Sequence, residues 1–274
     1  MPEITSSDGV RLNYLESGDP HGRPVVLVAG FKAPATSWNP QLAALEGAGY
    51  RVIALDRRGH GASAVGPDGA HTMDSHGADI GEVIAALGLA DATVVGQSMG
   101  GNSIWALLAA GRVNGIRDVV IVDQTPKMLN THDWPYGFYG YDESNADTYF
   151  ASGIPDPGRH SVASKGPVRV ARLLRATDLK AARAGFTTAE LELLGDHAKR
   201  DWRPAIAASP VPALFVAGRE SEIWPCEHAA AAAALNAAAT STVIDKAGHA
   251  TNIEQPKAFN EVLRNWLARR PAAA

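Results

Sequence analysis

The sequence contains a single cysteine, Cys226, among 274 residues. One cysteine cannot form an intramolecular disulfide, and this fits a reducing compartment. The alanine-rich stretch 229–239 contains Asn236 and is too short to span a bilayer. Residues 1–8 have neither the basic segment nor the apolar core of a secretory signal. We therefore expect a cytoplasmic protein without a membrane partner.

Lysine and arginine form no run, and the formal net charge is -4 with a sequence pI of about 6.1. A mildly acidic chain of this kind is not expected to bind nucleic acid or an anionic membrane as its main partner. Histidine, aspartate and glutamate show no cluster with the tight spacing of metal ligands. We predict no metal site and no cofactor, and we expect a small-molecule substrate.

Residues 92–101 carry the clearest chemical signal. An apolar segment, 92–95, runs into Gly96–Gly100, which reads Gly-Gln-Ser-Met-Gly, and an apolar segment with helical spacing follows. This pattern is typical of a nucleophile elbow, in which a tight strand-to-helix turn exposes a serine hydroxyl and directs backbone N–H groups at the reacting carbonyl. We predict that Ser98 is the nucleophile.

Apolar, β-rich segments alternate with helical ones, and the alternation predicts an α/β fold whose mostly parallel sheet is covered by helices on both faces. No buried-strand pattern occurs between 124 and 204. We predict a core domain formed by residues 1–123 and 205–274 and a cap inserted at 124–204. The expected strands are 10–16, 24–29, 51–55, 92–95, 118–122, 213–217 and 241–244, and the expected helices are 168–174, 188–194, 229–239 and 256–268.

Three further motifs occur in a fixed order: Val-Ala-Gly-Phe at 28–31, Asp-Arg-Arg-Gly-His-Gly-Ala-Ser at 56–63, and Gly-His at 248–249. With the serine motif, they resemble the alpha/beta-hydrolase superfamily over nearly the whole chain. The resemblance implies an oxyanion hole formed by the backbone N–H groups of Phe31 and Met99, with Gln97 also lining the pocket. Many relatives have histidine where this chain has Ala29, but backbone donors do not depend on that side chain.

His249 is the predicted general base. It follows the last expected strand, and a loop there lies at the carboxyl edge of the sheet, as the elbow does. The chain order serine, acid, histidine is the one expected of this fold. His60 is the main alternative, although its glycine-rich setting is typical of a structural loop.

The acidic partner of the histidine is harder to assign. Most relatives carry it in a Gly-x-x-Asp-x-x-x-Pro pattern after the cap, but this chain has Ser221 at the aspartate position. Serine cannot supply the negative charge that orients the imidazole. We predict that Asp123 takes this role, because a minority of the superfamily carries the acid after the strand that precedes the cap. Glu220 and Glu222 stay open as alternatives.

The first part of the predicted cap is rich in aromatic residues, although these make up only 7% of the chain. Large rings can line a substrate cavity at low entropic cost, or they can pack the cap onto the core. Trp224, after the strand that follows the cap, could add another wall. The predicted substrate-binding residues are Gln97, Trp134, Tyr136, Phe138, Tyr139 and Trp224.

These features predict a serine hydrolase that forms an acyl-enzyme on Ser98. The expected substrate is a small apolar carboxylic ester or lactone, of cyclic or aromatic character. The resemblance also includes cofactor-free haloperoxidases, cofactor-free dioxygenases, carbon–carbon bond hydrolases and ligand receptors with little turnover. The last three are the alternatives that we keep open. A serine nucleophile excludes the chemistry of epoxide hydrolases and haloalkane dehalogenases, which need aspartate at the elbow.

Overall fold

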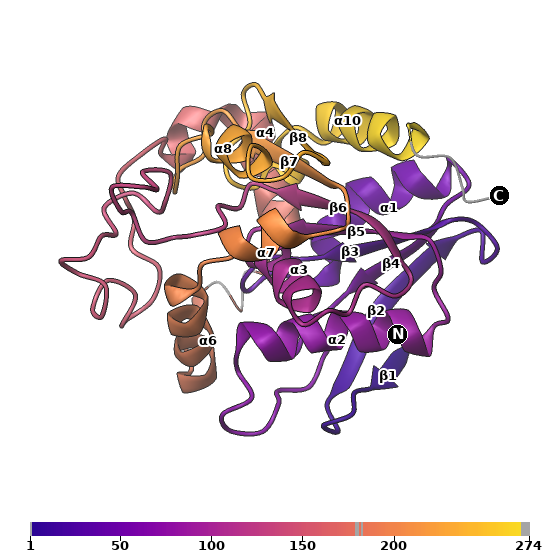
Figure 1. Ribbon diagram of the computed structural model, residues 1–274. Helices are drawn as coiled ribbons and strands as arrows, with labels where there is room; N and C mark the ends of the chain where they lie inside the picture. Colours follow the sequence, from indigo (N-terminus) through magenta and orange to yellow (C-terminus); the bar gives the residue numbers. More distant parts are fainter. Residues whose placement is uncertain (1, 179–180, 182, 270–274) are drawn as a thin grey trace.

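The computed structural model describes residues 2–178, 181 and 183–269. One sheet of eight strands has the order β1-β2-β4-β3-β5-β6-β7-β8 (Figure 1). β1 and β2 pair antiparallel, as do β2 and β4, whereas β3 to β8 run parallel. The strands are β1 (Glu3–Thr5), β2 (Arg11–Gly18), β3 (Pro24–Val28), β4 (Arg51–Leu55), β5 (Ala92–Gln97), β6 (Ile116–Val122), β7 (Ala213–Gly218) and β8 (Ala239–Ile244).

The central strands are largely buried and mostly apolar because both faces of the sheet are covered. Every residue of β7 is buried, for example, and all but one residue of β3. The predicted α/β class with a mostly parallel sheet is confirmed. β1 was not predicted, since its three residues are largely exposed at the sheet edge and show no apolar run.

Helices cover the two faces of this sheet (Figure 1). α1 (Asn39–Glu46) and α10 (Pro256–Ala268) bury residues such as Leu45 and Phe259 in one core cluster. α2 (Met73–Ala86), α3 (Met99–Ala109) and α8 (His228–Ala233) pack in the other, around Trp105 and its neighbours. Within the part of the chain that the structure describes, no helix is long and apolar enough to cross a bilayer.

The segment between β6 and β7 lies beyond the carboxyl ends of the strands, at the left of Figure 1. It starts as irregular chain, which side-chain bonds such as Asn130 Nδ2 to the Phe138 carbonyl (2.6 Å) hold in place. Helical pieces follow: η2 (Val162–Lys165), α4 (Gly166–Ala176), α6 (Thr188–Lys199) and α7 (Arg203–Ala208). The cap boundaries 124 and 204 stay a prediction.

The helix predicted over 229–239 is present but ends earlier than expected. α8 ends at Ala233, and Asn236 Nδ2 then donates to the carbonyls of Ile206 (2.8 Å) and Ser209 (2.9 Å). These bonds fix a turn, after which Ala239 pairs with β7 as the first residue of β8. Pairing with the sheet has overridden the helical propensity of alanine.

Candidate active site

Ser98 occupies a strained turn between β5 and α3. Its backbone has φ 53° and ψ −133°, a conformation that L-residues rarely adopt. A Cβ atom on Gly96 would lie 2.5 Å from the carbonyl carbon of Gly100, and one on Gly100 would lie 2.4 Å from the carbonyl oxygen of Val28. The two glycines therefore allow the close backbone approach that the turn requires.

A continuous chain of hydrogen bonds joins three segments that are distant in sequence. His249 Nε2 lies 2.9 Å from Ser98 Oγ, and His249 Nδ1 lies 2.8 Å from Asp123 Oδ2. His249 is in the loop after β8, and Asp123 is the first residue after β6. An imidazole bound in this way can take the serine proton on one nitrogen while the carboxylate fixes the tautomer through the other.

The Asp123 side chain is completely buried. Besides His249, it accepts hydrogen bonds from the backbone N–H of Gly218 (2.8 Å), Ser221 Oγ (2.6 Å) and Trp224 Nε1 (3.2 Å). Burial by itself raises the pKa of Asp123, but the adjacent imidazoles of His228 and His249 outweigh it and hold the pKa at about 2. His228 Nε2 lies 3.8 Å from Asp123 Oδ1, too far for a hydrogen bond, so His249 is the imidazole that binds the carboxylate directly. Asp123 is a carboxylate at any working pH.

The two alternative acids have other partners. Glu220 forms an ion pair with Arg169 (2.7 Å). Glu222 pairs with Lys165 and accepts the backbone N–H of His249 (2.7 Å), so it binds the main chain of the histidine and not its ring. Asp123 is the carboxylate that contacts the imidazole.

His60, the alternative base, is buried in a separate polar cluster. Its Nδ1 lies 2.8 Å from the carbonyl of Arg58 and its Nε2 lies 3.1 Å from the Arg57 guanidinium. Burial and the charge of Arg57 lower the pKa of His60 to about 3. Both ring nitrogens are therefore occupied away from Ser98.

Phe31 and Met99, the predicted oxyanion residues, both line the cavity beside Ser98. Met99 is the first residue of α3, where backbone N–H groups have no partner within the helix. The buried Arg57 guanidinium donates to the carbonyls of Ala29 (2.9 Å) and Gly30 (2.8 Å), which fixes the turn that precedes Phe31.

The cavity at Ser98 has a volume of about 110 Å³. Its polar side chains are those of Ser98, His197 and His249, and the others are apolar. This cavity is small compared with the roughly 300–1,000 Å³ of typical ligand pockets. Its apolar lining consists of Phe31, Met99, Met128, Phe138, Phe150, Ile154, Leu194, Ile223 and Trp224.

Two of the predicted aromatic contacts, Phe138 and Trp224, line this cavity, and the edge of Trp224 meets the ring of His249 with the centroids 5.2 Å apart. Trp134, Tyr136 and Tyr139 do not line it. Trp134 donates to Thr125 Oγ1 (3.1 Å) and packs against Tyr136, so these rings hold the irregular chain together.

Tyr139 and Gln97 also lie outside the lining of this cavity. The ring of Tyr139 lies under the Arg159 guanidinium, 3.9 Å from its centroid. Gln97 Nε2 donates to the carbonyl of His249 (3.1 Å), so it supports the histidine loop instead of lining the pocket.

Sequence analysis missed most of the wall that the cap contributes. Met128, Phe150 and Ile154 come from irregular chain that has no periodic pattern to reveal them. Leu194 and His197 are three residues apart and therefore lie on the same face of α6. The apolar spacing of that helix could have indicated which face is buried.

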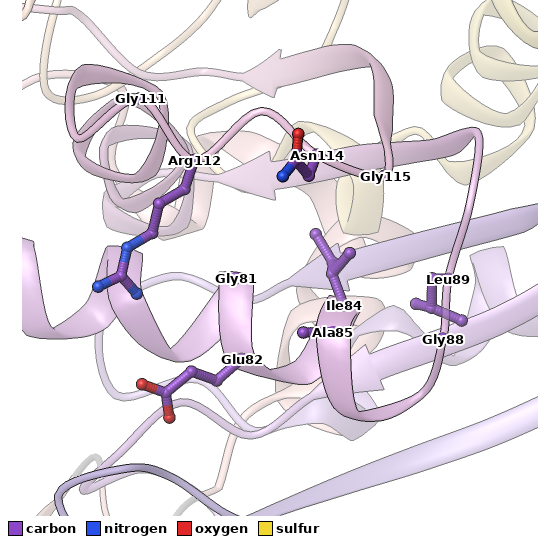
Figure 2. Close-up of a pocket in the computed structure, with 10 residues that line it drawn as sticks. All are labelled: Gly81, Glu82, Ile84, Ala85, Gly88, Leu89, Gly111, Arg112, Asn114 and Gly115. Carbon is purple, nitrogen blue, oxygen red and sulfur yellow. The ribbon is translucent and has the colours of Figure 1, made fainter.

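A larger cavity of about 460 Å³ lies elsewhere (Figure 2). It is formed by the end of α2 and by the glycine-rich turns that precede β5 and β6, with Glu82 and Arg112 as its charged side chains. These turns are at the amino ends of the strands, whereas Ser98 follows the carboxyl end of β5. It contains no nucleophile paired with a base, so the smaller cavity is the candidate active site.

Comparison with known proteins agrees with this geometry. The sequence profile of the alpha/beta hydrolase fold matches residues 23–256. A non-heme haloperoxidase from Rhodococcus erythropolis is 32% identical over 248 residues, which cover 84% of this chain and 85% of that protein. A 3-oxoadipate enol-lactonase from Acinetobacter baylyi is 26% identical, covering 97% of this chain and 96% of that protein. The crystal structure of a bromoperoxidase from Bacillus anthracis has a TM-score of 0.81 at 24% identity and covers 97% of this chain and 100% of that one. The chain belongs to the alpha/beta hydrolase fold family.

Proposed function

We propose that this protein is a serine hydrolase that cleaves a small carboxylic ester or lactone through an acyl-enzyme on Ser98. The observation that carries the proposal is the hydrogen-bonded chain from Ser98 through His249 to the buried Asp123. A serine in a strained turn at a cavity, joined to an imidazole and a carboxylate, is the arrangement that acyl transfer requires.

In the proposed mechanism, Ser98 Oγ attacks the substrate carbonyl while His249 Nε2 takes its proton. The N–H groups of Phe31 and Met99 stabilise the tetrahedral oxyanion. His249 then protonates the leaving alkoxide, which departs and leaves the acyl group on Ser98. Water attacks this ester with His249 again as base, and the acid is released.

The cavity favours a small, apolar acyl group. Its volume of about 110 Å³ and its wall of aromatic and aliphatic side chains suit a short chain or a small ring. The relative named 3-oxoadipate enol-lactonase supports including lactones among the candidate substrates.

The test is acid release, followed in a pH-stat, from matched linear esters and lactones of increasing size. We expect multiple turnovers on short members and a loss of roughly 10⁴-fold or more in kcat for Ser98→Ala. Ser103→Ala is the matched control, because Ser103 is a buried serine on the helix that follows Ser98 and donates to the Met99 carbonyl (3.0 Å). Activity that persists in Ser98→Ala would overturn the mechanism. The absence of acid release from every ester and lactone tested would favour a ligand receptor or non-hydrolytic chemistry.

The relatives named haloperoxidase favour a second candidate. Hydrogen peroxide could replace water in the attack on the acyl-enzyme and release a peroxyacid. The peroxyacid would then oxidise a halide ion to hypohalous acid and return to the carboxylic acid. Bromination of an added acceptor that needs peroxide, a short carboxylic acid or its ester, and Ser98 together would support this candidate. Ester hydrolysis without such bromination would exclude the haloperoxidase candidate and retain the serine hydrolase.

A further inference from the structure

His197 is a polar side chain that the proposed mechanism does not use. It lies on α6 and lines the cavity together with Ser98 and His249, and it is only 3% exposed. Its Nδ1 atom has no hydrogen-bond partner within the described residues. A buried ring nitrogen without a partner is costly, so its presence in the wall of an active-site cavity requires an explanation.

The neighbouring Asn102 determines which ring nitrogen carries the proton. Asn102 Nδ2 donates to the carbonyl of Thr125 (3.2 Å), and a carbonyl can only accept, so the amide orientation is fixed. The same Nδ2 atom lies 3.1 Å from His197 Nε2. An amide nitrogen can only donate, so Nε2 of His197 is the acceptor and bears no proton.

His197 is neutral in the folded protein. Burial, and after it the positive charge of Arg57, lowers its pKa to about 3. A neutral imidazole carries one proton, and since Nε2 has none, the proton is on Nδ1. His197 therefore carries a buried N–H on Nδ1 that no described residue accepts, in a side chain that lines the cavity.

We propose that His197 Nδ1 donates a hydrogen bond to a substrate oxygen outside the ester group that reacts. This inference rests on the proposed hydrolase function and narrows its substrate class. Preferred substrates are short esters or lactones that carry a second carbonyl, ether or hydroxyl oxygen. Apart from Ser98 and His249, the other side chains of the cavity wall offer such an oxygen no strong donor.

A site built to donate a hydrogen bond discriminates against an analogue that lacks the acceptor, because the donor then stays buried and unpaired. The test therefore compares 4-nitrophenyl esters of a short straight-chain acid with analogues of equal length in which a keto or ether oxygen replaces one methylene at successive positions. We expect the best oxygen-bearing ester to exceed its apolar counterpart by about 10-fold or more in kcat/KM.

Two variants separate hydrogen bonding from shape. His197→Phe removes the donor, so the ratio of kcat/KM between the two esters should fall to the ratio of their rates of alkaline hydrolysis without enzyme. His197→Asn keeps an N–H close to the position of Nδ1 and should retain part of the ratio. His132→Phe, which changes an exposed histidine, is the control and should leave the ratio as in the wild type. Thermal melting of each variant shows that it is folded.

The outcomes are distinct for the two proposals. An equal ratio in wild type and His197→Phe, or no preference in the wild type for any oxygen-bearing ester, overturns the role of His197 while the hydrolase stands. No turnover of any ester, together with no labelling of Ser98 by a fluorophosphonate, overturns both.

Discussion

At the scale of single residues, the main feature is the position of the carboxylate. Asp123 follows β6, whereas most relatives carry the acid after the next strand, at the position that Ser221 holds here. Ser221 Oγ donates to Asp123 Oδ2 at 2.6 Å, so the two positions meet in space. The same Oδ2 atom binds His249 Nδ1, so Ser221 donates to the oxygen that contacts the imidazole.

This proximity predicts a rescue. Asp123→Asn should lower kcat by roughly 10³- to 10⁴-fold, because an amide does not stabilise the imidazolium and can bind the wrong tautomer. Adding Ser221→Asp should restore at least about 10-fold of that loss, since the new carboxylate occupies the position that most relatives use. Both values come from initial rates on the best short ester. An unchanged rate in Asp123→Asn would show that another group orients His249.

At the scale of elements, an ion cluster connects the segment between β6 and β7 to the histidine loop. Lys165 of η2 pairs with Glu222 and with the buried Glu254 (2.9 Å), and Arg169 of α4 also pairs with Glu254. Glu222 and Glu254 accept the backbone N–H groups of His249 (2.7 Å) and Gly248 (3.1 Å). The cluster therefore holds the loop that carries His249.

Lys165 acts as a positioning residue in this cluster. We expect Lys165→Met to lower kcat by about 10-fold with a smaller change in KM, because it removes the partner that two carboxylates share. Lys199→Met, which removes an exposed ion pair with Asp147, is the control and should change neither constant. Equal effects of the two variants on kcat would contradict a role of the cluster in placing His249.

The elbow itself predicts a contrast between two glycines. Gly100→Ala should destabilise the protein by about 3 kcal/mol, because its Cβ would overlap the Val28 carbonyl oxygen in the middle of the sheet. Gly195 lies within α6 with no atom within 4 Å of an added Cβ, so Gly195→Ala should stabilise by about 0.5–1 kcal/mol. Urea denaturation measures both, and a similar effect of the two changes would show that the elbow is not tightly packed.

At the scale of the whole molecule, buried neutral histidines couple stability to pH. Burial and the charge of Arg57 lower the pKa of His60 and His197 to about 3, and they also depress the pKa of His76. The unfolded chain takes up these protons near pH 6.5 and the folded chain does not. Stability is therefore complete above about pH 6.5 and declines as the pH falls toward the folded values.

The expected size of this effect is large. His60 and His197 each take up a proton on unfolding, which together corresponds to a loss of up to about 3 kcal/mol in the free energy of unfolding per pH unit between about pH 6 and 4, and the lowered pKa of His76 adds to this loss. Urea denaturation at several pH values measures the slope. His60→Gln should reduce it by about one third, whereas His21→Gln, at an exposed position, should not alter it. A flat profile from pH 7 to 5 would contradict the neutral state of these rings.

Local patterns in the chain were enough to predict the sheet, the elbow at Ser98 and the position of His249. A buried strand is mostly apolar, and the strained turn needs a glycine before and after the serine. Each of these features therefore shows as a pattern in residues that are close in sequence. The helix expected over 229–239 ends at Ala233, and Ala239 instead pairs with β7 as the first residue of β8.

Only the tertiary structure decided which carboxylate meets His249, which rings face the cavity and that His197 lies in its wall. Asp123 and His249 are 126 residues apart, and Asn102 and His197 are 95 apart. No local pattern encodes such contacts, because they depend on how the segment between β6 and β7 packs over the ends of the strands. The sequence alone thus determined the turn at Ser98, while the fold determined which carboxylate contacts His249 and which side chains line the pocket.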